Sequence, residues 1–173
     1  MKILVAEDEP SIRMQYQAVL EERGHKVVAT ADGRACVKSY SAELDYANSG
    51  TGASKKPFDL VILDYRMPEL DGLGAAREIL SLCPGQRIVF ASAYVAETLR
   101  EAARDLHQIV ELLQKPFGLD YLVEVVEDTD VYQQLASVNV KVRELQNHNL
   151  SLSELVGLLA GVRKLQAMII APR

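Results

Sequence analysis

The most constraining feature of this chain is an apolar run, Leu60–Leu63, that stands directly before an acid, Asp64. Four apolar residues are too few for a helix and are typical of a strand buried on both faces, as in the middle of a parallel sheet. Pro68 and Gly72 follow as turn signals, so the strand ends at Asp64. An acid there points into the crevice where open α/β sheets bind ligands. Taken alone, Asp64 is better explained as an acid that only starts the turn.

Strand and helix patterns alternate along the first 128 residues. Short β-branched or apolar runs predict strands at 2–6, 26–30, 60–64, 87–91 and 109–113. Apolar residues at helical spacing predict helices at 10–23, 33–44, 73–82, 96–106 and 119–126. A strand-helix unit repeated five times favours the α/β class, with a doubly wound parallel sheet and right-handed crossovers.

A polar segment from Tyr46 to Pro57 interrupts this alternation. It is rich in Gly, Ser, Asn and Thr, which is typical of a surface loop. Its two glycines lack the pattern of a phosphate-binding Walker loop. We therefore expect a surface insertion that lies far from the carboxyl edge of the sheet.

Composition excludes several classes of protein. A length of 173 residues allows one domain and a small appendage. The formal net charge of −5 does not indicate bulk affinity for nucleic acid or anionic membranes. No run approaches the roughly 18 apolar residues of a membrane span, and the N-terminus does not resemble a signal peptide. Cys36 and Cys83 have no metal-site spacing and are expected to be reduced, in a cytoplasmic protein.

Polar side chains follow four of the predicted strands. They are Glu7 and Asp8, Asp64, Ser92 and Lys115, and parallel strands bring them to one edge. Three carboxylates repel one another, which a hard divalent cation such as Mg²⁺ resolves. A lysine suits a phosphoryl oxygen. The set therefore predicts a phosphoryl group placed on Asp64 as the nucleophile. The alternative is that the acids cap helices and Lys115 pairs with one of them.

Four motifs at these strand ends resemble the receiver domain of two-component response regulators. They are Leu4-Val5-Ala6-Glu7-Asp8-Glu9, Asp64-Tyr65-Arg66-Met67-Pro68, Ala91-Ser92-Ala93 and Lys115-Pro116-Phe117. The resemblance covers about residues 1–128. It implies a flavodoxin-like sheet of order 2-1-3-4-5 and a phosphoacceptor protein that is not a turnover enzyme. The phosphodonor would be a histidine kinase, a histidine phosphotransfer protein or a small phosphodonor.

The resemblance also implies the metal ligands. Asp8 and Asp64 would ligate Mg²⁺ directly, Glu7 would help through water, and the backbone carbonyl of Arg66 would complete the protein ligands. The family often has two aspartates where this chain has Glu7 and Asp8, and glutamate should keep metal binding.

Ser92 and Lys115 would each bond a phosphoryl oxygen, and the bond between Lys115 and Pro116 is expected to be cis. Ser92 replaces the commoner threonine. The aromatic switch residue, usually three before the lysine, is here Leu112. Tyr94 either covers the site in its place or is a plain surface tyrosine.

Residues 129–173 fall outside the resemblance and show two apolar stripes. The first follows a 3-4 heptad spacing and the second is offset from it, through Val131, Leu135, Val138, Val142, Leu145, Asn149 and Leu152, then Leu155, Leu158, Val162, Leu165 and Ile169. Ser151–Glu154 is a candidate capping box, which favours a helical hairpin over one coiled-coil rod. Such a hairpin needs cover, so we expect a homodimer or a protein partner. The alternative is a hairpin folded onto its own receiver.

The leading function is a phosphorylation-controlled interaction protein. The switch would pass through the last two strands, their helices and the extension. A DNA-binding transcriptional regulator is the alternative, although 129–173 is short and has no basic stripe. A phosphatase of the haloacid dehalogenase type is disfavoured, because Arg66 stands where that family has a second aspartate.

Overall fold

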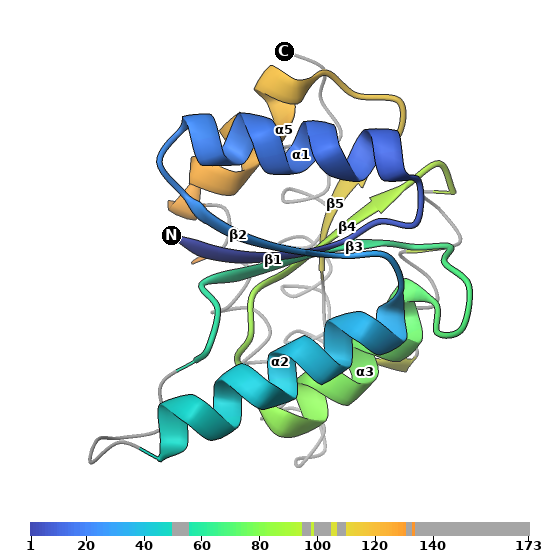
Figure 1. Cartoon of the computed structure of the whole chain (residues 1–173). Coiled ribbons are helices and arrows are strands. Elements are labelled where there is room, and N and C mark those ends of the chain that lie inside the picture. The colour runs from blue at the N-terminus through green and yellow to red at the C-terminus, as the bar shows by residue number, and fades with distance from the viewer. Residues whose placement is uncertain (50–55, 95–97, 99–104, 107–109, 131–132, 134–173) are drawn as a thin grey trace, which may run out of the picture.

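A computed structural model describes residues 1–49, 56–94, 98, 105–106, 110–130 and 133. Five parallel strands form one sheet in the order β2-β1-β3-β4-β5, which confirms the predicted topology. The strands are β1 (Lys2–Ala6), β2 (Lys26–Thr30), β3 (Leu60–Asp64), β4 (Ile88–Ser92) and β5 (Glu111–Gln114). Figure 1 shows that α1 (Pro10–Glu22) and α5 (Leu119–Glu127) cover one face of the sheet. On the other face lie α2 (Gly33–Asn48) and α3 (Gly72–Leu82).

Local sequence explains where these helices begin. Pro10 occupies the first turn of α1, where its missing N–H costs nothing. The Asp32 side chain accepts a hydrogen bond from the Ala35 N–H at 2.7 Å and caps α2. Asp71 caps α3 in the same way through the Gly74 N–H, also at 2.7 Å. The Asp71-Gly72 pair that predicted a turn is therefore a helix start.

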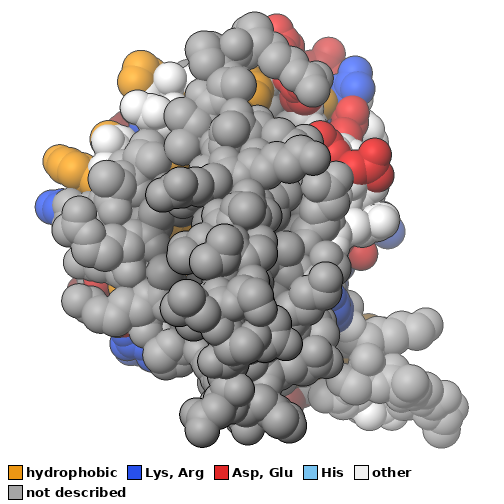
Figure 2. All heavy atoms as spheres, turned by 180° about the vertical axis from the view of Figure 1, so that it is seen from behind, with side chains coloured by type: hydrophobic (Ala, Val, Ile, Leu, Met, Phe, Trp, Pro, Cys, Tyr) orange, Lys and Arg blue, Asp and Glu red, His pale blue; other side chains and the backbone are white. Residues whose placement is uncertain are grey.

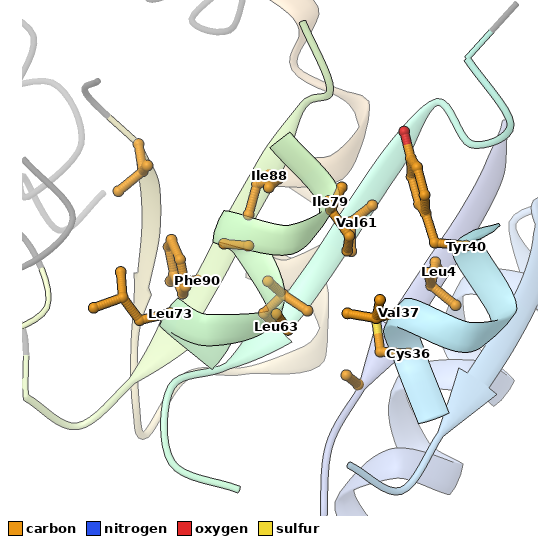
Figure 3. Packing of buried hydrophobic residues seen from close by; sticks show 14 of the residues in the cluster. Leu4, Cys36, Val37, Tyr40, Val61, Leu63, Leu73, Ile79, Ile88 and Phe90 are labelled. Atoms are coloured by element: carbon orange, nitrogen blue, oxygen red, sulfur yellow. The ribbon is translucent and has the colours of Figure 1, made fainter. Parts of the chain in front are cut away.

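The core lies on both faces of the sheet. All five residues of β3 and of β4 are buried, as expected for central strands of a parallel sheet. Figure 3 shows Val37 and Tyr40 of α2 and Ile79 of α3 in one buried cluster with side chains of the sheet such as Leu4, Val61 and Phe90. A second cluster packs α1 and α5 against the opposite face. Because β3 and β4 are buried in the core, packing holds the carboxyl ends of these strands in place.

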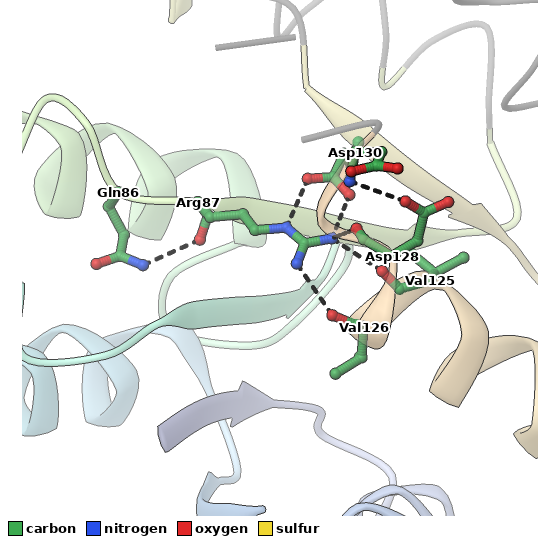
Figure 4. A network of polar contacts seen from close by, with 7 residues as sticks. Gln86, Arg87, Val125, Val126, Asp128 and Asp130 are labelled. Atoms are coloured by element: carbon green, nitrogen blue, oxygen red, sulfur yellow. Dashed lines mark hydrogen bonds and ion pairs between the residues drawn. The ribbon is translucent and has the colours of Figure 1, made fainter. Parts of the chain in front are cut away.

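A buried arginine connects the sheet to the end of α5. Arg87 precedes β4, and its guanidinium binds both carboxylate oxygens of Glu111 at 2.7 and 2.8 Å. The same group donates to the carbonyls of Val125, Val126 and Asp128 at 2.8–3.0 Å (Figure 4). The first two carbonyls belong to the last turn of α5 and the third to its C-cap residue, and α5 has no further turn to bind them. The arginine is thus a C-terminal cap supplied from another element.

Several predicted boundaries were wrong by a few residues. Helix α2 continues to Asn48, four residues beyond its expected end and into the predicted loop. The Ser49 N–H donates to the Asp45 carbonyl, which prolongs the helix where Gly and Ser were expected to end it. Strand β4 includes Ser92, and β5 spans Glu111–Gln114, one residue beyond its expected end, whereas residue 109 lies outside the described residues. Most of the predicted helix 96–106 and nearly all of the extension 129–173 lie outside the described residues.

The cysteines and the surface of the described residues agree with what the composition predicted. Cys36 and Cys83 are both free thiols. No helix among the described residues is long and apolar enough to cross a membrane. Figure 2, seen from behind, shows acidic side chains of the described residues gathered along one margin of the molecule.

Candidate functional site

Strand register places three acids at the carboxyl edge of the sheet. Ala6 of β1 pairs with Leu63 of β3, so the residues that follow each strand are neighbours. One carboxylate oxygen from each of Glu7, Asp8 and Asp64 lies within 4.8 Å of the other two. Glu7 and Asp64 are buried, whereas Asp8 is exposed to solvent. The predicted convergence of these acids is therefore present in the fold.

Lys115 lies between two of these carboxylates. Its Nζ is 2.7 Å from Glu7 Oε2 and 3.1 Å from Asp64 Oδ1. The Lys115 N–H donates to the Ser92 carbonyl at 2.9 Å, which continues the β4–β5 ladder and fixes the lysine backbone. The Lys115–Pro116 bond is cis, as the family resemblance implied. The lysine thus has one ammonium group between two acids from different strands.

Burial and charge shift the pKa values of all three groups. Burial raises the pKa of Asp64, and Lys115 only partly offsets that rise. Burial also raises the pKa of Glu7, against the hydrogen bond from Lys115 and with the help of the Asp64 charge. Burial alone would lower the pKa of Lys115, but the two carboxylates outweigh it and raise that pKa. Burial thus disfavours the charged form of both acids, and Lys115 offsets only part of that cost.

The backbone of Asp64 is fixed by two close contacts. A Cβ added to Gly72 would lie 2.2 Å from the Asp64 carbonyl oxygen, so only glycine allows α3 to begin this near the strand. The Gly72 N–H donates to the Tyr65 carbonyl at 3.0 Å. The Tyr65 N–H in turn donates to the Ala91 carbonyl of β4 at 3.1 Å. From the sequence, Gly72 was identified only as a turn signal, and this close approach to Asp64 was not predicted.

Ser92 is a buried residue at the end of β4. Its hydroxyl contacts groups other than the three acids. Its Oγ accepts from the Tyr94 N–H at 2.9 Å and lies 2.9 Å from the hydroxyl of Thr98. Thr98 is fully buried. Sequence reasoning missed Thr98, because a residue six positions after the strand end carries no motif.

Two further positions were singled out from the sequence. Tyr94 is half exposed, and the Arg66 guanidinium lies 4.2 Å from its ring centre, in cation–π geometry. The tyrosine is therefore neither isolated nor buried over the acids. Leu112 belongs to β5, where its side chain is buried in the core and contributes no aromatic ring.

The donor set fits a magnesium ion. Mg²⁺ prefers oxygen ligands, usually one or two carboxylates completed by waters. Two buried carboxylates and one exposed carboxylate supply such oxygens, and the exposed Asp8 leaves a side of the site open to water. By the family resemblance, Asp8 and Asp64 would hold the ion directly and Glu7 through water, and the Arg66 carbonyl would complete the set.

Comparison with known proteins gives the family of the chain. Residues 3–127 match the family of response regulator receiver domains. The transcriptional regulatory protein PdtaR of Mycobacterium tuberculosis is 39% identical over 129 residues, which cover 73% of this chain and 55% of PdtaR. This chain thus spans about half the length of that relative. The response regulator receiver protein CpdR of Brucella abortus is 30% identical over 129 residues, which cover 73% of this chain and 93% of CpdR.

A solved structure agrees with this match. The response regulator protein TrrA of Thermotoga maritima, in complex with Mg²⁺ and BeF, is 30% identical with a TM-score of 0.57. The match covers 73% of this chain and 96% of TrrA. Over residues 3–127 the chain therefore belongs to the receiver domain family of response regulators, which are signalling proteins of two-component systems.

Proposed function

We propose that Asp64 accepts a phosphoryl group and that Mg²⁺ binds at the neighbouring acids. The observation that carries the proposal is the position of Lys115, whose ammonium contacts Asp64 and Glu7 at the carboxyl edge. Asp64 is a buried carboxylate beside one cation and two further acids. Such a group can act as a nucleophile toward phosphorus when the charge around it is neutralised.

The reaction follows from the groups present. A carboxylate oxygen of Asp64 forms a bond to phosphorus, and the bond from phosphorus to the leaving group breaks. The leaving nitrogen of a phosphohistidine, or the oxygen of a small acyl phosphate, keeps the electron pair. Lys115 is positioned to exchange one carboxylate partner for a phosphoryl oxygen. When bound, Mg²⁺ would neutralise negative charge on the transferring group.

The experiment compares wild type with Asp64→Asn and with Asp45→Asn. The second variant makes the same change at an exposed position of α2. Purified protein is incubated with Mg²⁺ and labelled acetyl phosphate or a phosphorylated histidine kinase, and bound label is counted. Binding of beryllofluoride is measured by calorimetry. We expect wild type and Asp45→Asn to take up label and mimic, and Asp64→Asn to take up neither. Label on Asp64→Asn equal to that on wild type would contradict the proposal.

The output is proposed to pass through residues 129–173, by dimerisation or by binding a protein partner. The two apolar stripes of that segment support this proposal, because a helical hairpin alone cannot bury both. Light scattering of the same proteins, with and without beryllofluoride, tests it. A dimer that forms only with the mimic, and not in Asp64→Asn, indicates phosphorylation-driven assembly. A monomer in every condition would contradict dimerisation. A cytoplasmic location stays a prediction.

A transcriptional output is the second candidate. It is favoured by the similarity to PdtaR, which is a transcriptional regulatory protein. The acidic margin in Figure 2 and the net charge of −5 offer it no support. Salt-sensitive nucleic-acid binding by the whole chain would support this candidate over a protein partner.

A further inference from the structure

The hydroxyl of Ser92 takes part in a small buried network. The Tyr94 N–H donates to Ser92 Oγ at 2.9 Å. The Thr98 hydroxyl lies 2.9 Å from Ser92 Oγ and 2.8 Å from the Tyr94 carbonyl oxygen. Among the described residues, neither Asp64 nor Lys115 forms a hydrogen bond with Ser92 Oγ. The serine is therefore held by its own loop and by Thr98.

Counting protons shows how the network is connected. Each hydroxyl has one proton and can also accept. When Thr98 donates to the Tyr94 carbonyl, the Ser92 proton is directed at Thr98 Oγ1. When Thr98 donates to Ser92 instead, Ser92 Oγ accepts from both Thr98 and the Tyr94 N–H. In either arrangement Thr98 restrains the serine hydroxyl.

We propose that Thr98 is a positioning residue that holds Ser92 in its resting place and so opposes the phosphorylated state. The inference rests on the proposed phosphorylation of Asp64. To bond a phosphoryl oxygen, Ser92 must donate its proton to that oxygen. In the arrangement in which Ser92 donates to Thr98 Oγ1, that proton has to leave Thr98. Phosphorylation from this arrangement exchanges a neutral hydrogen bond for a charge-assisted one, and the difference sets part of the switch equilibrium.

The effect of Thr98 on the switch can be measured separately from its effect on the stability of the fold. The Tyr94 carbonyl also accepts the Thr98 backbone N–H at 2.9 Å. Removing the Thr98 hydroxyl therefore leaves this carbonyl bonded. Valine has nearly the same shape as threonine and fills the same buried space. The main consequence of Thr98→Val is the loss of one partner of Ser92.

The experiment uses the whole chain as wild type, Thr98→Val and Thr98→Ser, the last of which keeps the hydroxyl. Calorimetry gives the dissociation constant of beryllofluoride at saturating Mg²⁺ and, separately, that of Mg²⁺ alone. A neutral hydrogen bond typically contributes about 1 kcal/mol. We therefore expect Thr98→Val to bind beryllofluoride about three- to tenfold more tightly, with Mg²⁺ affinity unchanged. Thr98→Ser should behave as wild type.

A second measurement needs neither metal nor mimic. Hydrogen exchange of the Tyr94 amide reports its bond to Ser92 Oγ, and we expect faster exchange in Thr98→Val than in Thr98→Ser. Unchanged or weaker beryllofluoride binding by Thr98→Val, with Mg²⁺ affinity and melting temperature preserved, would overturn the inference. If wild type itself binds no beryllofluoride, the proposed phosphorylation fails instead.

Discussion

At the scale of single residues, Lys115 has two carboxylate partners and one charge to share between them. The shorter contact is with Glu7, at 2.7 Å, and the longer is with Asp64, at 3.1 Å. The resemblance implied Glu7 only as an indirect metal ligand, and the alternative paired Lys115 with one of the acids without saying which; the closer partner is Glu7. Glu7 therefore holds the Lys115 ammonium beside Asp64, and the lysine divides its charge between the two carboxylates.

Gly72 provides a prediction at this scale. Alanine at 72 would place a Cβ about 2.2 Å from the Asp64 carbonyl oxygen, so α3 and the strand end must separate. We expect Gly72→Ala to lower the free energy of unfolding by about 1–3 kcal/mol, the usual cost of overpacking. Urea unfolding measures this cost, and beryllofluoride affinity should fall with it because Asp64 moves.

Gly85→Ala is the matched control. The nearest atoms to its added Cβ belong to the flexible Lys56 side chain, at 3.5 Å. We expect a change within about 1 kcal/mol, because alanine fits there without strain. Equal effects of the two substitutions on the free energy of unfolding would show that the close approach of α3 to Asp64 does not cause the loss of stability.

At the scale of elements, α5 is attached to the sheet by its packed face and by Arg87 at its last turn. The guanidinium is buried and pairs with Glu111 at the start of β5. Burial raises the pKa of Glu111 even against this pairing. The pair is therefore costly to bury, and its clearest gain is the capping of three α5 carbonyls.

The element-scale prediction is that Arg87→Met lowers the free energy of unfolding by about 3–5 kcal/mol. The change leaves Glu111 buried without Arg87, its ion-pair partner, and removes the donor to the carbonyls at the end of α5. Urea unfolding measures the loss. Hydrogen exchange should increase most at the end of α5.

A double variant separates the two contributions. Arg87→Met with Glu111→Leu restores charge balance but not the capping, so we expect partial recovery. Arg34→Met, which breaks an exposed ion pair with Glu78, should cost less than about 1 kcal/mol. Full recovery in the double variant would show that the capping contributes nothing.

At the scale of the whole molecule, the acids at the carboxyl edge link stability to pH. Burial raises the folded-state pKa of Asp64, so the folded protein holds this proton more tightly than the unfolded chain. The stabilisation is complete below the ordinary carboxyl value, about 4. It is lost as pH rises through the folded pKa. Metal-free wild type should therefore lose stability relative to Asp64→Asn as pH rises.

Urea unfolding of both proteins from acid to neutral pH measures this difference. Added Mg²⁺ at neutral pH should reduce or reverse it, because the ion binds the folded state of wild type. Glu127→Gln is the control. Hydrogen bonding to Arg23 lowers the pKa of Glu127. This carboxylate is exposed and lies far along the chain from Glu7, Asp8 and Asp64. A stability difference between wild type and Asp64→Asn that does not change with pH would contradict the prediction.

Much of the architecture could be predicted because it depends on local patterns. Buried runs such as Leu60–Leu63 identify strands, and parallel pairing then brings Glu7, Asp64 and Lys115 to one edge. The partners of these groups could not be predicted. Which acid binds Lys115 more closely depends on side-chain geometry, and the Thr98–Ser92 contact depends on how the loop after β4 folds. No periodicity in the sequence encodes either.

The capping of α5 by Arg87 has a practical consequence for producing the receiver alone. The family match ends at residue 127, and a gene cut there would replace the Asp128 carbonyl with a charged chain terminus beside the buried guanidinium. The new carboxylate would compete with Glu111 for the arginine. A fragment intended for crystals or spectra should therefore extend past Asp128, so that the arginine keeps its native acceptors.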